Sequence, residues 1–418
     1  MMYRSPSARM LAQMRNPGMP SWRRVWVFVV LTSPVCVAAV YALMDPAQWD
    51  YAFDFRLLWL AGSTWLHGYS PYMPAFDALY AAHFGGGQAS WHVFNYPPYF
   101  ALIALPLATL PYAVATKLWL GVNVVCVALS AAILSSGFAA RSLGLQIIVY
   151  AAIVVFALTS YPGGYSLYYG QTTLLVLLGA CLFVHGYVGK SAVPLCVGLV
   201  LLSLKPNLGL LPGLLVAGSV YDFRAWQWQT WALWPVLTTL LFAVVGTGLV
   251  IAMTGFDATV PAFAARIAAY SATPPSAVYS LTGMPYLVDT LSSLSMPLWL
   301  SLVLAGAVCI VAVRRTTDRT IAVCSVLAAG FFFLPLHTYD LIVAVSLAPL
   351  LWTLSVPRAV IGALGMLMIH RCVSLVLEVN PRTWLDDGLL PATLGTLALL
   401  AVSLIRHDRD RPQRGVMP

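Results

Sequence analysis

Four groups of polar side chains stand at the ends or breaks of long apolar segments in this chain. A charged side chain near the core of a bilayer is costly, so residues held there indicate a functional site by default. A carboxylate among them has the chemistry of a general base, and the cations have the chemistry of phosphate ligands. In chain order the groups are Asp54 with Arg56, Gly170-Gln171 after the aromatic run 161–169, Lys205-Pro206-Asn207, and Pro335-Leu336-His337-Thr338-Tyr339-Asp340.

Each group also has a purely structural interpretation. Asp54 could cap or anchor the first turn of a helix, where the helix dipole favours an acid. Gln171 could cap a helix or bond to a neighbouring one, and taken alone this interpretation is favoured. Lys205 could extend its ammonium to the membrane interface, but it is one of three lysines and lies in a run otherwise apolar from 193 to 220, which favours function. His337 and Asp340 could pair with each other at a helix start.

The composition identifies a helical membrane protein. Of the 418 residues, 60% are hydrophobic and 9% charged, and the mean hydropathy is +0.83. A soluble domain carries roughly 25% charged residues. The apolar runs are long and continuous, unlike the alternating segments of a β-barrel. The net charge of +8 lies mostly in short flanks and loops, where it reports orientation rather than nucleic-acid binding.

The apolar segments predict an all-α polytopic protein with about twelve transmembrane helices. Helix parity within 97–220 stays open, because 97–110 is short for a span and 191–220 is long and broken at Lys205-Pro206. The segments are 25–43, 97–110, 112–134, 143–159, 171–188, 191–220, 231–253, 296–313, 320–336, 340–356, 359–377 and 388–405.

The loops between these segments define the domain organisation and the orientation. Residues 1–24 form a basic tail, 25–405 a single transmembrane domain, and 406–418 a second basic tail. The positive-inside bias places both tails in the cytoplasm. The first outer loop is then 45–96, with an amphipathic helix over 53–66 on the membrane surface, and the second is 254–295. Asp54 and the 337–340 group share the outer face, which is periplasmic for a bacterial inner membrane and luminal in a eukaryote.

Neither cysteine nor histidine spacing predicts a metal site or a disulfide framework. The cysteines lie singly in apolar stretches and contain no C-x-x-C pair, which is typical of small buried hydrophobes. His67, His83 and His92 lie in the first outer loop without helical pairing or a nearby carboxylate cluster, so we expect no metal there. There is also no Gly-rich phosphate motif following a strand, and hence no nucleotide-binding domain.

Several short motifs in fixed order resemble those of glycosyltransferase family 87, the polyprenol-phosphate-mannose-dependent mannosyltransferases. The resemblance spans roughly 25 to 380 and departs at Gln171-Thr172-Thr173, where Asn is expected soon after Gln. The matching pieces are Asp54-Phe55-x-x-x-Trp59-x-Ala61-Gly62, Phe94-x-Tyr96-Pro97-Pro98, Leu105-Pro106-Leu107-Ala108 with Leu110-Pro111, Gly170-Gln171, Leu204-Lys205-Pro206 and Pro335-Leu336-His337-x-Tyr339-Asp340.

The resemblance implies a GT-C fold in which the acid of the first outer loop, Asp54, is the catalytic base. The donor it implies is a sugar, mannose in this family, on a polyprenyl phosphate, and no cofactor is needed. A departing phosphate requires cationic partners, and the candidates in order are Lys205, His337 and Arg56. Substrate-binding or supporting roles fall to Tyr96, Gln171, Tyr339 and Asp340.

A single base and an external hydroxyl predict inversion at the anomeric carbon. The expected partners are the lipid-linked donor, the bilayer and an acceptor that is a glycolipid, polysaccharide, phosphatidylinositol mannoside or protein, with no nucleic acid. Two alternatives stay open. A sugar or lipid transporter or flippase would also contain broken helices, although the chain shows no internal repeat. An accessory subunit of an envelope-assembly complex would need no Asp54.

Overall fold

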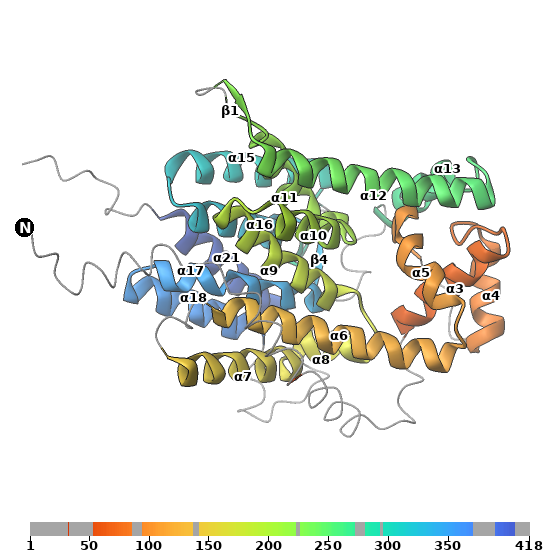
Figure 1. Cartoon of the computed structure of the whole chain (residues 1–418), viewed down its shortest axis with the longest axis horizontal. Coiled ribbons are helices and arrows are strands. Elements are labelled where there is room, and N and C mark those ends of the chain that lie inside the picture. Colours follow the sequence, from red (N-terminus) through yellow and green to blue (C-terminus); the bar gives the residue numbers. More distant parts are fainter. Residues whose placement is uncertain are drawn as a thin grey trace, which may run out of the picture.

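The computed structural model describes residue 32 and residues 53–85, 94–136, 142–222, 226–271, 281–292, 296–370 and 389–405. Apart from Thr32, the predicted first helix lies outside the described residues, as do both tails and parts of both outer loops, including His92. The described chain is an all-α bundle with two small two-stranded sheets (Figure 1). The predicted fold class is confirmed to that extent.

The helices correspond closely to the predicted apolar segments, with additional short helices in the outer loops. In chain order the elements are α3 (Phe53–Leu66), α4 (Ala75–Phe84), η3 (Pro98–Phe100), α5 (Ala101–Ala108), α6 (Tyr112–Ser135), α7 (Leu143–Thr159), α8 (Tyr161–Tyr168), α9 (Thr173–Gly189), α10 (Ala192–Ser203), α11 (Pro206–Gly218), β1 (Tyr221–Asp222), β2 (Gln227–Trp228), α12 (Thr230–Thr254), α13 (Val260–Ser271), β3 (Leu281–Thr282), α14 (Met284–Ser292), α15 (Leu298–Arg315), α16 (Arg319–Phe333), β4 (Leu336–His337), η6 (Thr338–Leu347), α17 (Ala348–Thr353), α18 (Val356–Ile369) and α21 (Leu389–Leu404).

Helix α9 is the centre of the bundle. It is buried along almost its whole length and contacts α6, α10, α16 and η6. Small residues let α9 and α10 approach closely: a Cβ on Gly198 would lie 2.6 Å from the backbone nitrogen of Phe183. Such glycine contacts are the usual means of close helix packing in membranes. The first turn of α9, at Thr173, is therefore held rigidly in the protein interior.

The helical path is interrupted at two places, one inside the predicted 191–220 segment and one directly after the predicted 143–159 segment. The 191–220 segment ends its first helix at Ser203 and restarts at Pro206, because proline lacks an N–H and disfavours helix in the residue before it. Lys205 lies in this break with an extended backbone. The second interruption is a 62° bend between α7 and α8. The predicted break at Lys205-Pro206 is confirmed, whereas the short helix α8 was not predicted.

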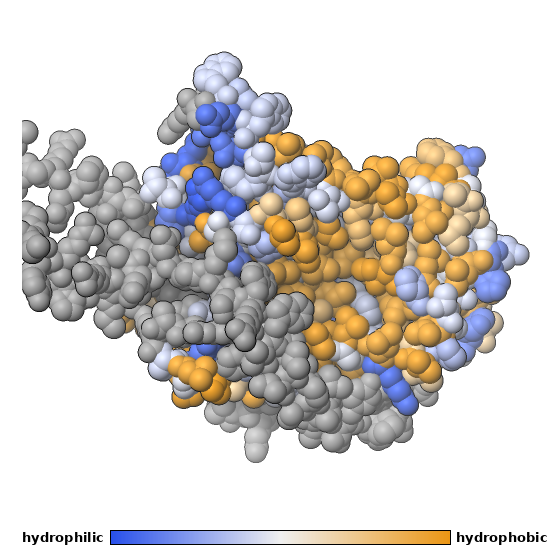
Figure 2. Space-filling model, in the orientation of Figure 1, coloured by the Kyte–Doolittle hydropathy of each residue, from blue (hydrophilic) through white to orange (hydrophobic). Residues whose placement is uncertain are grey.

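The surface of the bundle carries a broad apolar region (Figure 2). Helix α12 is exposed along most of its length and contributes the exposed side chains Leu237, Leu240, Leu241, Val244 and Val245. An apolar surface of this extent is typical of a membrane protein. Among the described residues three helices are long and apolar enough to cross a bilayer, α6, α12 and α15, or four if α7 and α8 count as one bent span. The predicted count of about twelve is not confirmed, since most apolar helices here are shorter.

Helix α3 is confirmed where the sequence predicts it, but it is more buried than a helix lying on a membrane surface. Phe55, Leu58 and Ala61 are almost inaccessible, because α5 covers one side of the helix and the ring of Trp119 stacks on Phe55 at a centroid distance of 5.7 Å. Gly62 is the point of closest approach to α5, where a Cβ would lie 2.4 Å from the carbonyl oxygen of Ala104.

The second outer loop returns to the centre of the molecule through a short strand pair. Backbone residues Leu281 and Thr282 of β3 pair antiparallel with His337 and Leu336 of β4. The Thr282 hydroxyl also donates to the carbonyl of Leu336 at 3.1 Å. This pairing, which no sequence pattern indicated, anchors the segment that carries His337.

We expect Gly62→Ala to destabilise the fold and to displace Asp54, because α3 cannot move away from α5 without losing its packing. Overpacking of this kind costs about 1–3 kcal/mol. Thermal unfolding in detergent measures the loss. The matched control is Gly121→Ala in α6, where a Cβ meets nothing within 4 Å. Equal melting temperatures for the two variants would contradict the proposed role of the α3–α5 contact.

Candidate functional site

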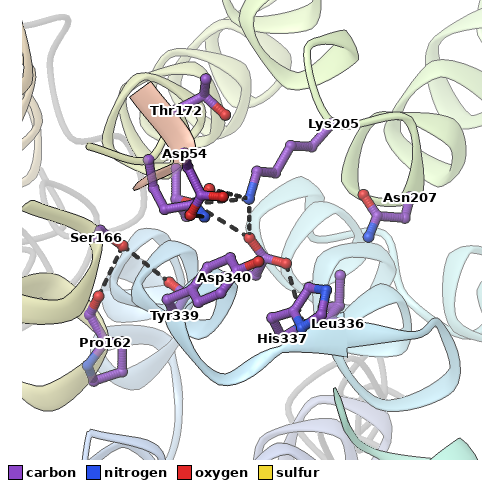
Figure 3. Close-up of polar contacts among 12 residues, drawn as sticks. Asp54, Pro162, Ser166, Thr172, Lys205, Asn207, Leu336, His337, Tyr339 and Asp340 are labelled. Atoms are coloured by element: carbon purple, nitrogen blue, oxygen red, sulfur yellow. Dashed lines mark hydrogen bonds and ion pairs between the residues drawn. The ribbon is translucent and has the colours of Figure 1, made fainter. Parts of the chain in front are cut away.

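Four of the predicted polar residues meet in one cluster, although they are far apart in the sequence. Asp54 comes from α3, Gln171 from the turn between α8 and α9, Lys205 from the α10–α11 break and Asp340 from η6. Figure 3 shows the Lys205 side chain extending from its break toward Asp340, with Asp54 beside it. Gln171 is 2% exposed, Lys205 8% and Asp340 1%, whereas Asp54 is partly accessible.

The end of α8 places both Gln171 and Asp54. Gly170 adopts a left-handed backbone with φ 65°, its N–H donates to Leu167 O at 3.1 Å, and the N–H of Gln171 donates to Ser166 O at 2.8 Å. This is a Schellman motif, in which glycine at the left-handed position ends a helix. The carbonyl of Tyr169 accepts the N–H groups of Asp54 and Phe55 at 3.1 and 3.3 Å. The start of α3 therefore rests on the end of α8.

Helix α8 is in turn fixed to the segment that carries Asp340. The Ser166 hydroxyl contacts the carbonyl of Tyr339 at 3.3 Å as well as that of Pro162 at 2.8 Å (Figure 3). On the other side, the indole N–H of Trp119 donates to the carbonyl of Gly170 at 2.8 Å. The turn before Gln171 is thus held from two directions.

The side-chain amide of Gln171 links the two charged parts of the cluster. Its nitrogen donates to Oδ2 of Asp54. Its oxygen accepts from Nζ of Lys205 at 3.3 Å and from the hydroxyl of Tyr96 at 3.4 Å. Tyr96 is further held by its backbone carbonyl, which accepts from the Tyr72 hydroxyl at 2.8 Å. The structure therefore places Tyr96 and Gln171, two of the residues expected to bind substrate or support the site, in one cluster with Asp54.

Lys205 is the centre of a buried ion pair. Its ammonium contacts Oδ1 of Asp340, the hydroxyl of Thr173 at 2.9 Å and the oxygen of Gln171. It also lies 4.8 Å from the ring centroid of Tyr339, close enough for a cation–π contact. An ammonium has three N–H donors, and the three oxygens match them. The positive charge of Lys205 is thereby compensated inside the protein.

His337 and Asp340 form the capping box at the start of η6. The backbone N–H of His337 donates to Oδ2 of Asp340 at 3.2 Å, and the His337 side chain accepts the backbone N–H of Asp340. The structural interpretation of this pair is therefore confirmed. The imidazole of His337 also stacks on Tyr339, with ring centroids 5.0 Å apart at 15°. Asp340 thus serves both the cap and the ion pair with Lys205.

The position of Asp54 alters its acidity. Burial raises the pKa of Asp54 from its ordinary value of 3.8 to about 6, while Lys205 and the Gln171 hydrogen bond act in the opposite direction and Asp340 adds to the rise. A carboxylate with a pKa near 6 is a stronger base than a free aspartate and is still ionised at neutral pH. Its partial exposure leaves it open to a reactant.

Arg56 does not join this cluster. Residues two positions apart on a helix face opposite sides, and the guanidinium of Arg56 lies 5.1 Å from the ring centroid of Phe84 in α4. Two residues that sequence analysis did not select do take part, Thr172 and Thr173. Thr173 accepts from Lys205 and donates to Asp340 at 3.2 Å, and Thr172 contacts the Tyr96 hydroxyl at 3.5 Å. Their position at the start of an apolar helix, directly after Gln171, was the available signal.

Within the part of the chain that the structure describes, no group of three or more His, Cys, Asp or Glu side chains is arranged to hold a metal ion. The cluster offers two carboxylates, and one of them, Asp340, is already paired with Lys205. Its remaining polar atoms are donors and acceptors suited to hydroxyl and phosphate groups.

One comparison with known proteins gives a match. The family model described as glycosyltransferase family 87 matches residues 94–338, more than half of the chain. The matched span contains Tyr96, Gln171, Lys205 and His337 and ends just before Asp340, whereas Asp54 lies outside it. No curated protein matches the chain significantly, and no solved structure does.

We expect Lys205→Met to be strongly destabilising, and Asp340→Asn to offset much of that loss in the double variant. Removing one partner of a buried ion pair leaves an uncompensated charge and costs about 3–5 kcal/mol, whereas a neutral pair avoids this. Thermal unfolding of the wild type, both single variants and the double variant gives the coupling between the two residues. If the stability lost by the double variant equals the sum of the losses of the two single variants, the two charges contribute to stability independently.

Proposed function

Because the chain belongs to glycosyltransferase family 87, we propose that it is an inverting membrane enzyme that transfers a sugar from a polyprenyl phosphate to a hydroxyl group. Asp54 is the general base, the sugar is mannose, and the acceptor is a glycolipid or glycan of the cell envelope. One observation carries the proposal: the partly exposed Asp54, outside the family match, is joined through Gln171 to residues inside it.

The reaction is a single displacement at the anomeric carbon. The acceptor oxygen forms the new bond to this carbon as the bond to the phosphate oxygen breaks, and the hydroxyl proton passes to Asp54. The electron pair of the broken bond leaves with the polyprenyl phosphate. General-base catalysis of this kind contributes about 10²–10⁴ in rate. Because one carboxylate acts and the acceptor attacks directly, a β-linked donor yields an α-linked product.

His337 is the residue that best suits the departing phosphate. An imidazole N–H can donate to a phosphate oxygen, and the His337 ring lies at the start of η6, next to Asp340. Stacking on Tyr339 fixes the ring plane, and the β3–β4 pairing fixes the backbone. A preorganised donor of this kind stabilises the charge that develops on a leaving group. Arg56 and Lys205 are engaged elsewhere, with Phe84 and Asp340 respectively.

A lipid-linked donor suits the surface of this protein. The polyprenyl chain partitions into the bilayer beside exposed apolar helices such as α12, and the sugar phosphate then meets the site at the membrane edge. We place this edge on the periplasmic side of a bacterial inner membrane, with both termini in the cytoplasm, from the distribution of arginines. The proposed displacement uses no nucleotide or other cofactor, and the sequence does not indicate a divalent cation.

We expect Asp54→Asn to lower transfer by at least about 10²-fold without lowering stability. Because burial raises the pKa of Asp54 to about 6, the ionised carboxylate costs stability above that pH and the neutral amide removes the cost. The assay follows label from polyprenyl-phosphate-[14C]mannose to a membrane lipid and glycan extract, with the melting temperature measured at pH 7.5.

Asp257→Asn is the control, because Asp257 is exposed and lies outside the cluster. It should transfer label at the wild-type rate. Near-normal turnover by Asp54→Asn would refute the assignment of the base. If the wild type transfers no label but moves the labelled lipid across the vesicle membrane, a transporter or flippase is favoured instead.

We also expect the rate of transfer to fall as the pH is lowered through about 6. The base must be ionised, and the pKa of Asp54 is raised to about 6, so each further pH unit below this value lowers the rate about tenfold. The effect is measured as initial rates of the wild type between pH 4.5 and 8, in buffers whose pH ranges overlap. A rate that stays constant down to pH 4.5 would contradict a carboxylate of raised pKa as the base.

A further inference from the structure

The Gln171 amide stands between the base and the buried ion pair, and only one of its two orientations is compatible with its neighbours. Its oxygen faces two donors, Nζ of Lys205 and the hydroxyl of Tyr96. Its nitrogen faces the carboxylate of Asp54. Rotating the amide by half a turn would place its N–H groups against an ammonium and its oxygen against a carboxylate. The charges on either side therefore fix the amide.

The orientation of Lys205 is equally determined. Thr173 accepts from the ammonium and donates to Asp340, and Asp340 is fixed by the backbone N–H of His337. The three N–H donors of the ammonium are matched by Gln171, Thr173 and Asp340, so a phosphate oxygen could bind Lys205 only by displacing one of them. Buried polar networks of this kind are rigid when every member is satisfied.

A fixed amide has a direct consequence for Asp54. The hydrogen bond from Gln171 holds Oδ2 and so sets the rotation of the carboxylate about its own axis. The second oxygen, Oδ1, then has a defined direction in which to receive a proton. Transfer between groups held in the right orientation is far faster than between loosely held ones.

We propose that Gln171 is a positioning residue for Asp54, held in one orientation by the Lys205–Asp340 pair, and that Lys205 acts through this amide and not as a ligand of the donor phosphate. The proposal rests on the transferase function argued above. In this proposal the buried Lys205 supports the general base, and His337 contacts the donor phosphate.

The first experiment replaces the amide alone. Gln171→Met keeps the length of the side chain but removes its hydrogen bonds, and we expect kcat to fall between about tenfold and about 100-fold. The donor KM should stay within about twofold of the wild type. The acidic limb of the pH–rate profile should move to higher pH, because the lost hydrogen bond favoured the ionised carboxylate.

Gln171→Glu provides the matched charge test. It keeps both the length and an oxygen for Lys205 and Tyr96, but it places a second carboxylate against Asp54 in place of an N–H donor. Repulsion between the two favours protonation, so the acidic limb should move further upward than in Gln171→Met. Both variants should retain the wild-type melting temperature within a few degrees, since the Lys205–Asp340 pair remains intact.

The second experiment separates positioning from phosphate binding at Lys205. The double variant Lys205→Met with Asp340→Asn removes both charges and avoids an unpaired one. We expect kcat to fall as in Gln171→Met, while the affinity for polyprenyl phosphate itself, measured by thermal shift, stays within about twofold. Lys190→Met is the control, because Lys190 lies at the opposite end of α9 from Thr173.

The outcomes are distinct. A wild type that transfers label and a Gln171→Met variant with unchanged kcat and pH profile would overturn the positioning role. A second outcome is that the double variant loses tenfold or more of its affinity for polyprenyl phosphate, which is on the order of one direct charged contact. That result would show that Lys205 is a phosphate ligand and would overturn the claim that it acts only through Gln171. A wild type without any transfer would instead refute the proposed function on which both parts rest.

Discussion

The site depends on the need to neutralise one buried ammonium. Lys205 is 8% exposed in a protein interior that offers little solvation, and an unpaired charge there is very costly. Asp340, Thr173 and Gln171 meet this need together. They come from two distant parts of the chain, so satisfying the lysine draws η6 and the α8–α9 turn, with the first residue of α9, to the α10–α11 break. The geometry around Asp54 follows from that convergence.

The carboxylate of Asp54, the proposed base, is attached to this framework from outside. Helix α3 rests with its first N–H groups on the carbonyl that ends α8, and Gly62 brings it against α5. Asp54 itself remains partly accessible, and burial raises its pKa to about 6. The protein thus holds a carboxylate in an environment that disfavours its charge, which costs stability and makes it a better base. The packing of α3 against α5 and its hydrogen bonds to the end of α8 hold the carboxylate in this environment.

Much of this could be predicted from the sequence, and the remainder has clear physical reasons. Apolar runs and Lys205-Pro206 predicted the helices and the break, since length and proline chemistry are local properties. The motif order predicted that Asp54, Tyr96, Gln171, Lys205 and Asp340 belong together.

Sequence did not reveal that Asp340 pairs with Lys205, because pairing of residues 135 positions apart depends on tertiary packing. It also did not reveal the β3–β4 pair, which is too short to leave a periodic pattern. Arg56 lies outside the cluster, on the side of α3 that helix geometry turns away from Asp54. The predicted number of spans is not confirmed, because most apolar helices among the described residues are shorter than a full span.

The most direct test is a cryo-EM structure with a polyprenyl-phosphonate analogue of the mannosyl donor, in which the scissile oxygen is replaced by carbon. We expect the anomeric carbon to face Asp54, with room for one acceptor hydroxyl between them. The phosphonate should contact His337, and the contacts of Lys205 with Gln171 and Asp340 should be intact. A phosphonate bound by Lys205 with Asp340 displaced, or a sugar remote from Asp54, would contradict this expectation.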